Sequence, residues 1–115
     1  MYQFTYAEVV EDSPQEMRAR ERDALDRAVE LLRRADEAGV RSAEAQDALV
    51  YTHRLWTIFL DDLSSNGNDL PEALRAQLIS IGIWTIKEIE RLRIGAAESF
   101  ADLIEINAII RDGLL

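Results

Sequence analysis

Residues 13–39 read SPQEMRARERDALDRAVELLRRADEAG and hold the signals of one complete helix. Ser13 supplies an N-cap hydroxyl, and Pro14 suits the first helical position because its missing N–H costs nothing there. Glu16 stands where a capping box requires it, and Gly39 suits the left-handed position that ends a helix. Apolar residues recur between these signals at spacings of three and four: Met17, Ala24, Leu25, Ala28, Leu31, Leu32 and Ala35. The stretch therefore predicts a long amphipathic helix with one apolar side.

Three further helices follow from signals of the same kind. Ser42 suits an N-cap, residues 64–69 form a polar loop, and Pro71 and Gly95 suit the two ends of a third helix. Ser99 opens another possible capping box. We expect helices over residues 13–38, 42–63, 71–94 and 99–112. Four helices joined by short turns predict an all-α fold, a compact bundle of about four helices, in a single domain over residues 1–115.

The first twelve residues follow a different pattern. Tyr2, Phe4 and Tyr6 alternate with polar residues, a period of two that is typical of a strand. An isolated strand has nothing to pair with in a helical protein. We therefore expect residues 1–12 to form an aromatic N-terminal arm ahead of the helical bundle of residues 13–115, with side chains that dock on the bundle or on another molecule.

The third expected helix carries more apolar surface than one packing face needs. Its main stripe runs along residues 74–92, and further apolar side chains stand on its other sides: Ile79, Ile83, Ile86 and Trp84. Either this helix is central to the bundle, or the surplus surface faces a partner. Gly82 favours the close approach of another backbone, because a glycine inside a helix costs about 1 kcal/mol relative to alanine.

The expected core joins the apolar stripes of all four helices, with Phe59 and Leu78 at its centre. Its members are Leu25, Leu32, Leu49, Leu55, Phe59, Leu78, Ile81, Ile89, Leu103 and Ile110. Asn107 falls on the stripe of the fourth helix, where an unpaired amide costs about 1 to 3 kcal/mol. That amide either fixes the register of the helix or bonds the backbone of a partner.

Composition limits the kinds of function. The chain has 115 residues, 13 basic and 22 acidic, and a formal net charge of −9, so we expect no direct binding to nucleic acid or to an anionic membrane. It has no cysteine and one histidine, His53, which we interpret as structural; we expect no metal site, no cofactor and no catalytic residues. No apolar run is long enough for a membrane helix, and the N-terminus lacks a signal-peptide pattern. These observations predict a cytoplasmic, non-enzymatic protein.

Five segments together resemble the FlaF family, flagellar biosynthesis regulators of alphaproteobacteria. They are RLWTIF at residues 54–59, LPEALRAQLISIG at 70–82, KEIER at 87–91, IEIN at 104–107 and RDGL at 111–114. The Ser13-Pro14 helix start and the aromatic N-terminus fit the family as well. The resemblance extends over essentially the whole chain.

The resemblance implies a cytoplasmic factor that is needed for flagellin production and filament assembly. It implies action beside the regulator FlbT and directly on flagellin, as a secretion chaperone. Flagellin suits this role because its terminal segments form amphipathic helices in the filament, and a helical groove can cover their apolar faces before assembly. Since the chain is acidic, we assign any RNA contact to a partner protein.

Two functions remain open at this point. The first is a binding module that captures flagellin helices. The second is a self-associating adaptor, a possible homo-oligomer, that acts on flagellin translation through an FlbT-like regulator. For partner binding we expect a surface of aromatic and branched side chains: Tyr2, Phe4, Tyr6, Ile79, Ile83, Trp84 and Ile86.

Overall fold

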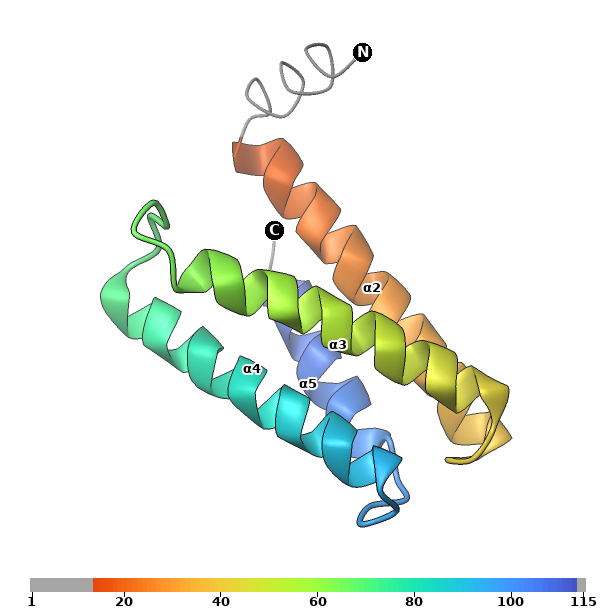
Figure 1. The fold of residues 1–115 in the computed structure, drawn as a ribbon. Helices are drawn as coiled ribbons and strands as arrows, with labels where there is room; N and C mark the ends of the chain where they lie inside the picture. Colours follow the sequence, from red (N-terminus) through yellow and green to blue (C-terminus); the bar gives the residue numbers. More distant parts are fainter. Residues whose placement is uncertain (1–13, 114–115) are drawn as a thin grey trace, which may run out of the picture.

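The computed structural model describes residues 14–113, which form four helices and, within that range, no strand. The helices are α2 (Pro14–Ala38), α3 (Ala43–Leu63), α4 (Glu72–Arg93) and α5 (Ala101–Gly113), as Figure 1 shows. The expected all-α bundle is thus confirmed, and the helix ends lie within two residues of the predicted ones. The aromatic arm with Tyr2, Phe4 and Tyr6, and the expected cap Ser13, lie outside the described residues.

Local hydrogen bonds explain where the helices begin and end. The Ser42 hydroxyl accepts a hydrogen bond from the N–H of Ala45 (3.0 Å) and donates one to the carbonyl of Gly39 (2.6 Å), so one side chain joins the end of α2 to the start of α3. Gly39 and Gly95 have positive φ angles of 104° and 80°, which suit glycine at a helix C-terminus. These are the ends that the sequence predicted.

The fourth helix starts on a contact from a distant part of the chain. The N–H of Phe100 donates a hydrogen bond to Oδ1 of Asp36 in α2 (3.2 Å), and the N–H of Ala101 donates one to the hydroxyl of Ser99 (3.1 Å). A carboxylate at a helix N-terminus is favourable because it pairs free N–H groups and opposes the helix dipole. Asp36 therefore fixes the start of α5 against the end of α2.

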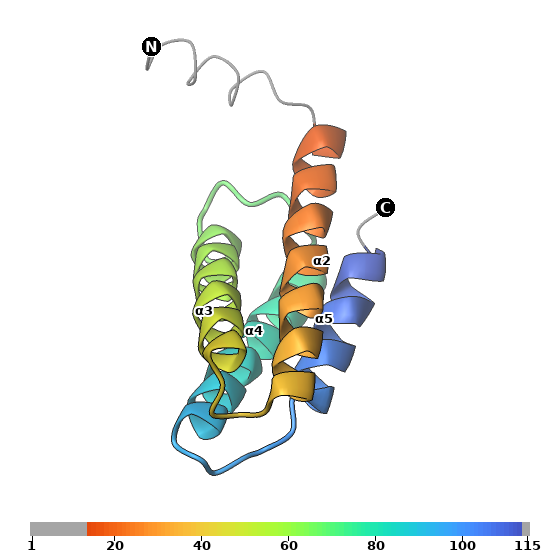
Figure 2. The ribbon, with the colours of Figure 1, turned by 90° about the vertical axis from the view of Figure 1, so that its right-hand side faces the viewer.

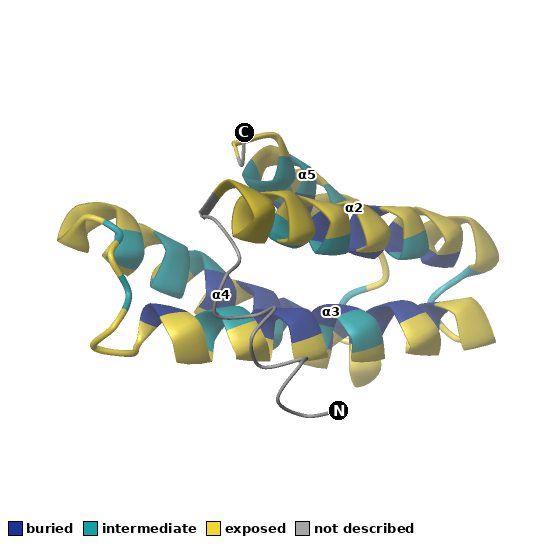
Figure 3. Cartoon of the chain, turned by 90° about the horizontal axis from the view of Figure 1, so that it is seen from above, coloured by how far each residue is buried: buried dark blue, intermediate teal, exposed yellow. Residues whose placement is uncertain are grey.

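The helices lie in two layers, with α2 beside α5 in one and α3 beside α4 in the other (Figures 2 and 3). The helix α2 packs against both α3 and α5, whereas α4 packs mainly against α3. The buried residues of α4 all lie from Gly82 onward. Of the two alternatives for the third helix, central burial is therefore wrong, because among residues 14–113 α4 is an edge helix and every side chain of its first half stays at least partly exposed.

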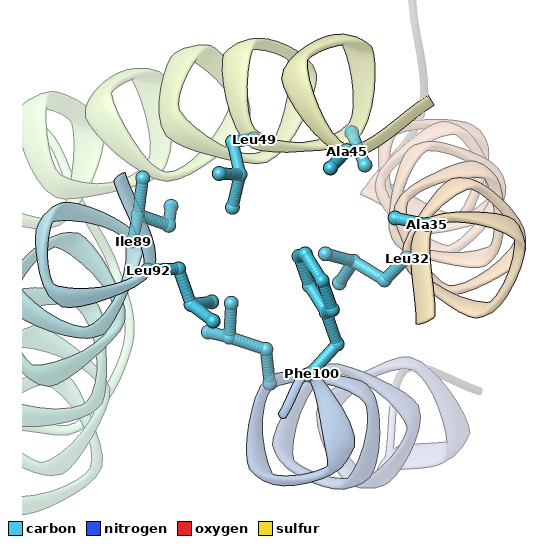
Figure 4. Close-up of a cluster of buried hydrophobic side chains, with 9 residues drawn as sticks. Leu32, Ala35, Ala45, Leu49, Ile89, Leu92 and Phe100 are labelled. Carbon is cyan, nitrogen blue, oxygen red and sulfur yellow. The ribbon is translucent and has the colours of Figure 1, made fainter. Parts of the chain in front are cut away.

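One end of the molecule, the closed end, holds a core to which all four helices contribute. Its side chains surround Phe100, as Figure 4 shows. The members of this cluster are Leu32, Ala35, Ala45, Ala48, Leu49, Ile89, Leu92, Phe100 and Leu103. A second buried cluster, of Leu25, Ala28, Leu55 and Trp56, continues the core along α2 and α3.

Six of the ten expected core residues are buried, and four are not. The buried ones are Leu25, Leu32, Leu49, Leu55, Ile89 and Leu103. Phe59, Leu78, Ile81 and Ile110 are only half-buried, so the placement of Phe59 and Leu78 at the centre of the core is wrong. Figure 1 shows that the first half of α2 diverges from the second half of α3, and at this open end the described helices leave apolar side chains partly exposed.

Gly82 allows a close approach, but of a different kind from the one expected. A Cβ atom at this position would lie 2.6 Å from Cδ2 of Leu60 and 3.1 Å from Cε3 of Trp56, both in α3. Side chains rather than a second backbone therefore occupy the space beside the glycine. Gly82 lets α4 pack closely on the Leu60 and Trp56 side chains of α3.

Candidate partner-binding groove

The divergence of the helices leaves a groove at the open end with a volume of about 390 Å³. Every helix and the loop between α3 and α4 contribute to its walls. The lining residues are Met17, Arg18 and Glu21 from α2; Trp56, Phe59, Asp62 and Leu63 from α3; Asn68, Asp69 and Leu70 from the loop; Leu74 and Leu78 from α4; and Ile109, Ile110 and Gly113 from α5. Pockets of this size that are mainly apolar with a few polar groups are typical binding sites.

The walls of the groove expose large apolar side chains. Met17, Leu74 and Ile109, from three different helices, are 50%, 42% and 56% exposed. Phe59 and Leu78 line the same groove and are half-buried. Apolar side chains gathered in one concave surface mark an interaction site more specifically than single exposed ones do.

The base of the groove is held by a buried hydrogen bond between α3 and α5. Nε1–H of Trp56 donates to Oδ1 of Asn107 (2.8 Å), and the Asn107 amide donates to the carbonyl of Leu103 (2.7 Å). The side chains of Trp56 and Asn107 are both almost completely buried. The ring of Phe59 packs edge-on against the ring of Trp56, with 5.3 Å between the ring centroids. Asn107 therefore fixes the position of α5, and the alternative in which it bonds a partner is wrong because the amide is inaccessible.

Charged side chains line the rim of the groove, and acidic ones outnumber basic ones. Glu21, Asp62 and Asp69 are acidic, and Arg18 is the basic residue among the lining residues. Burial raises the pKa of Glu21 above its ordinary value; the Arg18 charge lowers this pKa, and the nearby Asp62 charge raises it. Oδ2 of Asp62 accepts a hydrogen bond from the Asn68 side chain (3.1 Å) and so fixes the loop to the end of α3.

The residues that the sequence predicted for partner binding lie outside this groove where they are described. Ile83 and Trp84 are 46% and 39% exposed, while Ile79 and Ile86 are half-buried, and Ile86 packs against the second core cluster. Neighbouring residues of a helix point about 100° apart, so Ile83 and Trp84 face different directions. The structure brings the three isoleucines to one side of α4 and leaves Trp84 on another; Tyr2, Phe4 and Tyr6 lie outside the described residues.

Sequence reasoning missed the groove because it assigned several of its residues to packing stripes. Met17 is followed by residues 18–23, which are all charged except Ala19, a signal that it stands apart from the core. Leu74 and Ile109 carry no comparable signal, since their spacing fits an ordinary amphipathic helix.

The described residues also bear on metal and membrane binding. Between residues 14 and 113, no three His, Cys, Asp or Glu side chains are placed to hold a metal ion. His53 is half-buried. None of the four helices is both long enough and apolar enough to cross a membrane.

Comparison with known proteins identifies the family. No curated protein and no solved structure gives a significant match. The family model described as flagellar protein FlaF matches residues 2–114, nearly the whole chain. With this match, and with the segments of sequence that resemble the family, the chain belongs to the FlaF family of flagellar proteins.

Proposed function

We propose that this protein is a non-enzymatic cytoplasmic factor that binds flagellin as a secretion chaperone and thereby supports flagellin synthesis and filament assembly. Membership of the FlaF family supports the flagellar part of the proposal. The apolar groove at the open end is the observation that supports the binding part.

The shape and the chemistry of the groove suit one class of occupant. A partner helix presents its apolar side chains at spacings of three and four, and the groove offers apolar contacts from three helices: Met17, Leu74 and Ile109. Binding would cover side chains on both proteins that are otherwise exposed to water, which gives about 25 cal/mol for each Å² of apolar surface buried. Flagellin, with its terminal amphipathic helices, is the partner that the family implies.

The test compares two substitutions of exposed isoleucines. Ile109→Asp places a charge on the groove wall, and Ile94→Asp places one at the opposite end of the molecule, outside the groove. We expect Ile109→Asp to raise the Kd for purified flagellin monomer at least tenfold, about 1.4 kcal/mol, as measured by isothermal titration calorimetry. Ile94→Asp should bind as wild type does, and both variants should keep the helical circular dichroism signal. Equal Kd values for the two variants would show that flagellin does not bind in the groove.

The surface predicted on α4 and the arm is a second part of the proposal. Ile83→Asp, at a half-exposed position, should weaken flagellin capture while the Tm stays nearly unchanged. Unfolding of this variant would assign the isoleucine stripe to the core instead. Removal of the aromatic side chains of Tyr2, Phe4 and Tyr6 tests the arm in the same assay.

The second candidate function is a self-associating adaptor that acts through an FlbT-like regulator on flagellin translation. Large apolar side chains exposed outside the groove support a second contact surface: Ile58, Ile83 and Trp84. Analytical ultracentrifugation of the protein alone, with flagellin and with the FlbT-like regulator separates the two functions. A stable homo-oligomer that does not bind flagellin would favour the adaptor, and a complex that forms only with RNA would overturn the chaperone function.

A further inference from the structure

We propose that the groove selects helices that carry lysine or arginine beside their apolar face, because its apolar walls are bordered by the carboxylates of Glu21, Asp62 and Asp69. The inference rests on the proposed function, since it assigns the chemistry of the segment that the same groove accepts. It adds that the groove selects its partner helix by the charge of the residues beside the apolar face.

The acidic side chains and the apolar walls belong to one surface. Glu21 is one helical turn from Met17 on α2, and Asp62 and Asp69 lie at the end of α3 and in the loop that leads toward Leu74. An occupant that covers the apolar walls therefore brings its own flanks against carboxylates from both layers. Lysine and arginine suit those flanks, since their stems pack on apolar surface while the charged group reaches outward.

The groove charges are only partly balanced within the protein. Arg18 is close enough to lower the pKa of Glu21, whereas Asp62 acts in the opposite direction. The four charged lining residues leave an excess of two negative charges, three acidic minus one basic. A cation from a partner would reduce the repulsion between Glu21 and Asp62 and would gain Coulomb energy in a partly desolvated site.

Charge also argues against two other possible occupants of the groove, the N-terminal arm and a second copy of the chain. Residues 1–12 contain Glu8, Glu11 and Asp12 and no lysine or arginine, so the N-terminal arm matches the apolar walls but not the rim. A second copy of the chain carries a net charge of −9 and would bring like charges together. A helix from a different protein, with basic flanks, satisfies both features of the groove.

Two designed peptides of about 18 residues, five helical turns, test the selection. Both share one leucine and alanine face; one has lysines beside that face, and the other has glutamates. We expect the full-length protein to bind the lysine peptide at least about fivefold more tightly at low salt, as measured by calorimetry, and high salt to reduce the difference.

A pair of double variants assigns the effect to the rim. Glu21→Gln with Asp69→Asn removes two rim charges, and Asp47→Asn with Glu98→Gln removes two charges outside the groove. The rim variant should lose most of the preference for the lysine peptide, and the control variant should keep it. Asp62 is left in place because it accepts the hydrogen bond from Asn68 that fixes the loop.

Several outcomes would overturn the inference. Equal affinity for the two peptides, no binding of either, or an unchanged preference in the rim variant would each do so. The arm is the occupant if replacement of Tyr2, Phe4 and Tyr6 by serine tightens lysine-peptide binding severalfold. A second copy is the occupant if the wild-type protein forms a dimer that Leu74→Asp abolishes.

Purified flagellin separates this inference from the proposed function. If flagellin binds the wild-type protein and the rim variant equally at low and high salt, the charge selection fails and the chaperone proposal stands. If the lysine peptide is selected but flagellin does not bind, the charge selection stands and the chaperone proposal fails. If the rim variant loses affinity for flagellin and the control variant does not, the result supports both the charge selection and the chaperone proposal.

Discussion

At the scale of single residues, the Asn107 side chain joins parts of the chain that are far apart in sequence. Its oxygen accepts a hydrogen bond from the Trp56 indole of α3 and its NH₂ donates one to the Leu103 carbonyl within α5, so this amide links α5 to α3. A buried polar pair of this kind stabilises little in net terms, but it is costly to leave half-made. Asn107 is therefore a sensitive point of the base of the groove.

Asn107→Ala leaves the Trp56 N–H buried without its partner. We expect the free energy of unfolding to fall by about 1 to 3 kcal/mol, measured by urea denaturation. Asn66→Ala, in the exposed loop, serves as the control and should change stability by less than about 0.5 kcal/mol. Equal effects of the two substitutions would show that the buried hydrogen bond contributes nothing.

Glu21 is expected to make stability depend on pH. Its pKa in the folded protein is raised above the ordinary value of 4.5, chiefly by burial, so the folded state binds the proton more tightly than the unfolded state does. Any stability that protonated Glu21 provides is present below pH 4.5 and is lost as the pH rises through the folded pKa. Glu21→Gln should therefore have the same free energy of unfolding as the wild type below pH 4.5 and a higher one at pH 7. Urea titrations in acid and at pH 7 measure both values. A deficit of the variant at pH 7 would contradict this sign.

At the scale of the elements, α4 differs from the other helices because it is held at one end. Its buried residues begin at Gly82, and its first half contributes Leu74 and Leu78 to the groove wall. The side chains of Leu60 and Trp56 in α3 lie so close to Gly82 that a Cβ atom there would meet both of them. This contact determines how closely α4 lies on α3.

Gly82→Ala tests that contact. In an unobstructed helix, alanine gains about 1 kcal/mol over glycine. Here the new methyl group would lie 2.6 Å from Cδ2 of Leu60, and overpacking of this kind costs about 1 to 3 kcal/mol. We expect a net loss of about 1 kcal/mol in urea denaturation, and a smaller loss when Gly82→Ala is made in a Leu60→Ala background. A gain in the wild-type background would mean that Leu60 moves aside at no cost.

At the scale of the whole molecule, stability and binding are expected to lie at opposite ends. The closed end has a core from all four helices around Phe100, whereas the open end leaves apolar side chains at the surface of a groove. Exposure of such side chains is unfavourable in the isolated protein, and it is the source of binding energy when a partner covers them. The fold thus holds the groove open by packing elsewhere.

Two substitutions compare how much the closed end and the open end of the molecule contribute to stability. Phe100→Ala empties a fully buried site and should cost about 3 to 5 kcal/mol, a large part of the total stability of a domain of this size. Leu78→Ala, at the half-buried groove wall, should cost about 1 to 2 kcal/mol. Chemical denaturation measures both, and a larger loss for Leu78 would place the core at the open end.

The sequence by itself determined the helices and the part of the core where they meet. Caps and terminal glycines act through local hydrogen bonds and backbone angles, so Ser42, Gly39 and Gly95 identify helix ends without knowledge of the neighbours. The periodic stripes identify which side of each helix is apolar. The family-specific segments indicated a flagellar protein, and the match over residues 2–114 agrees.

Only the tertiary structure decided which apolar residues are covered. Periodicity gives the direction of a side chain but not whether a second helix reaches it, since the angle between helices depends on the side chains of both. Phe59, Leu78, Ile81 and Ile110 fit a core stripe as well as Leu55 does, yet they are only half-buried. The groove, its acidic rim and the Trp56–Asn107 bond at its base bring together residues from distant parts of the chain, so no local pattern contains them.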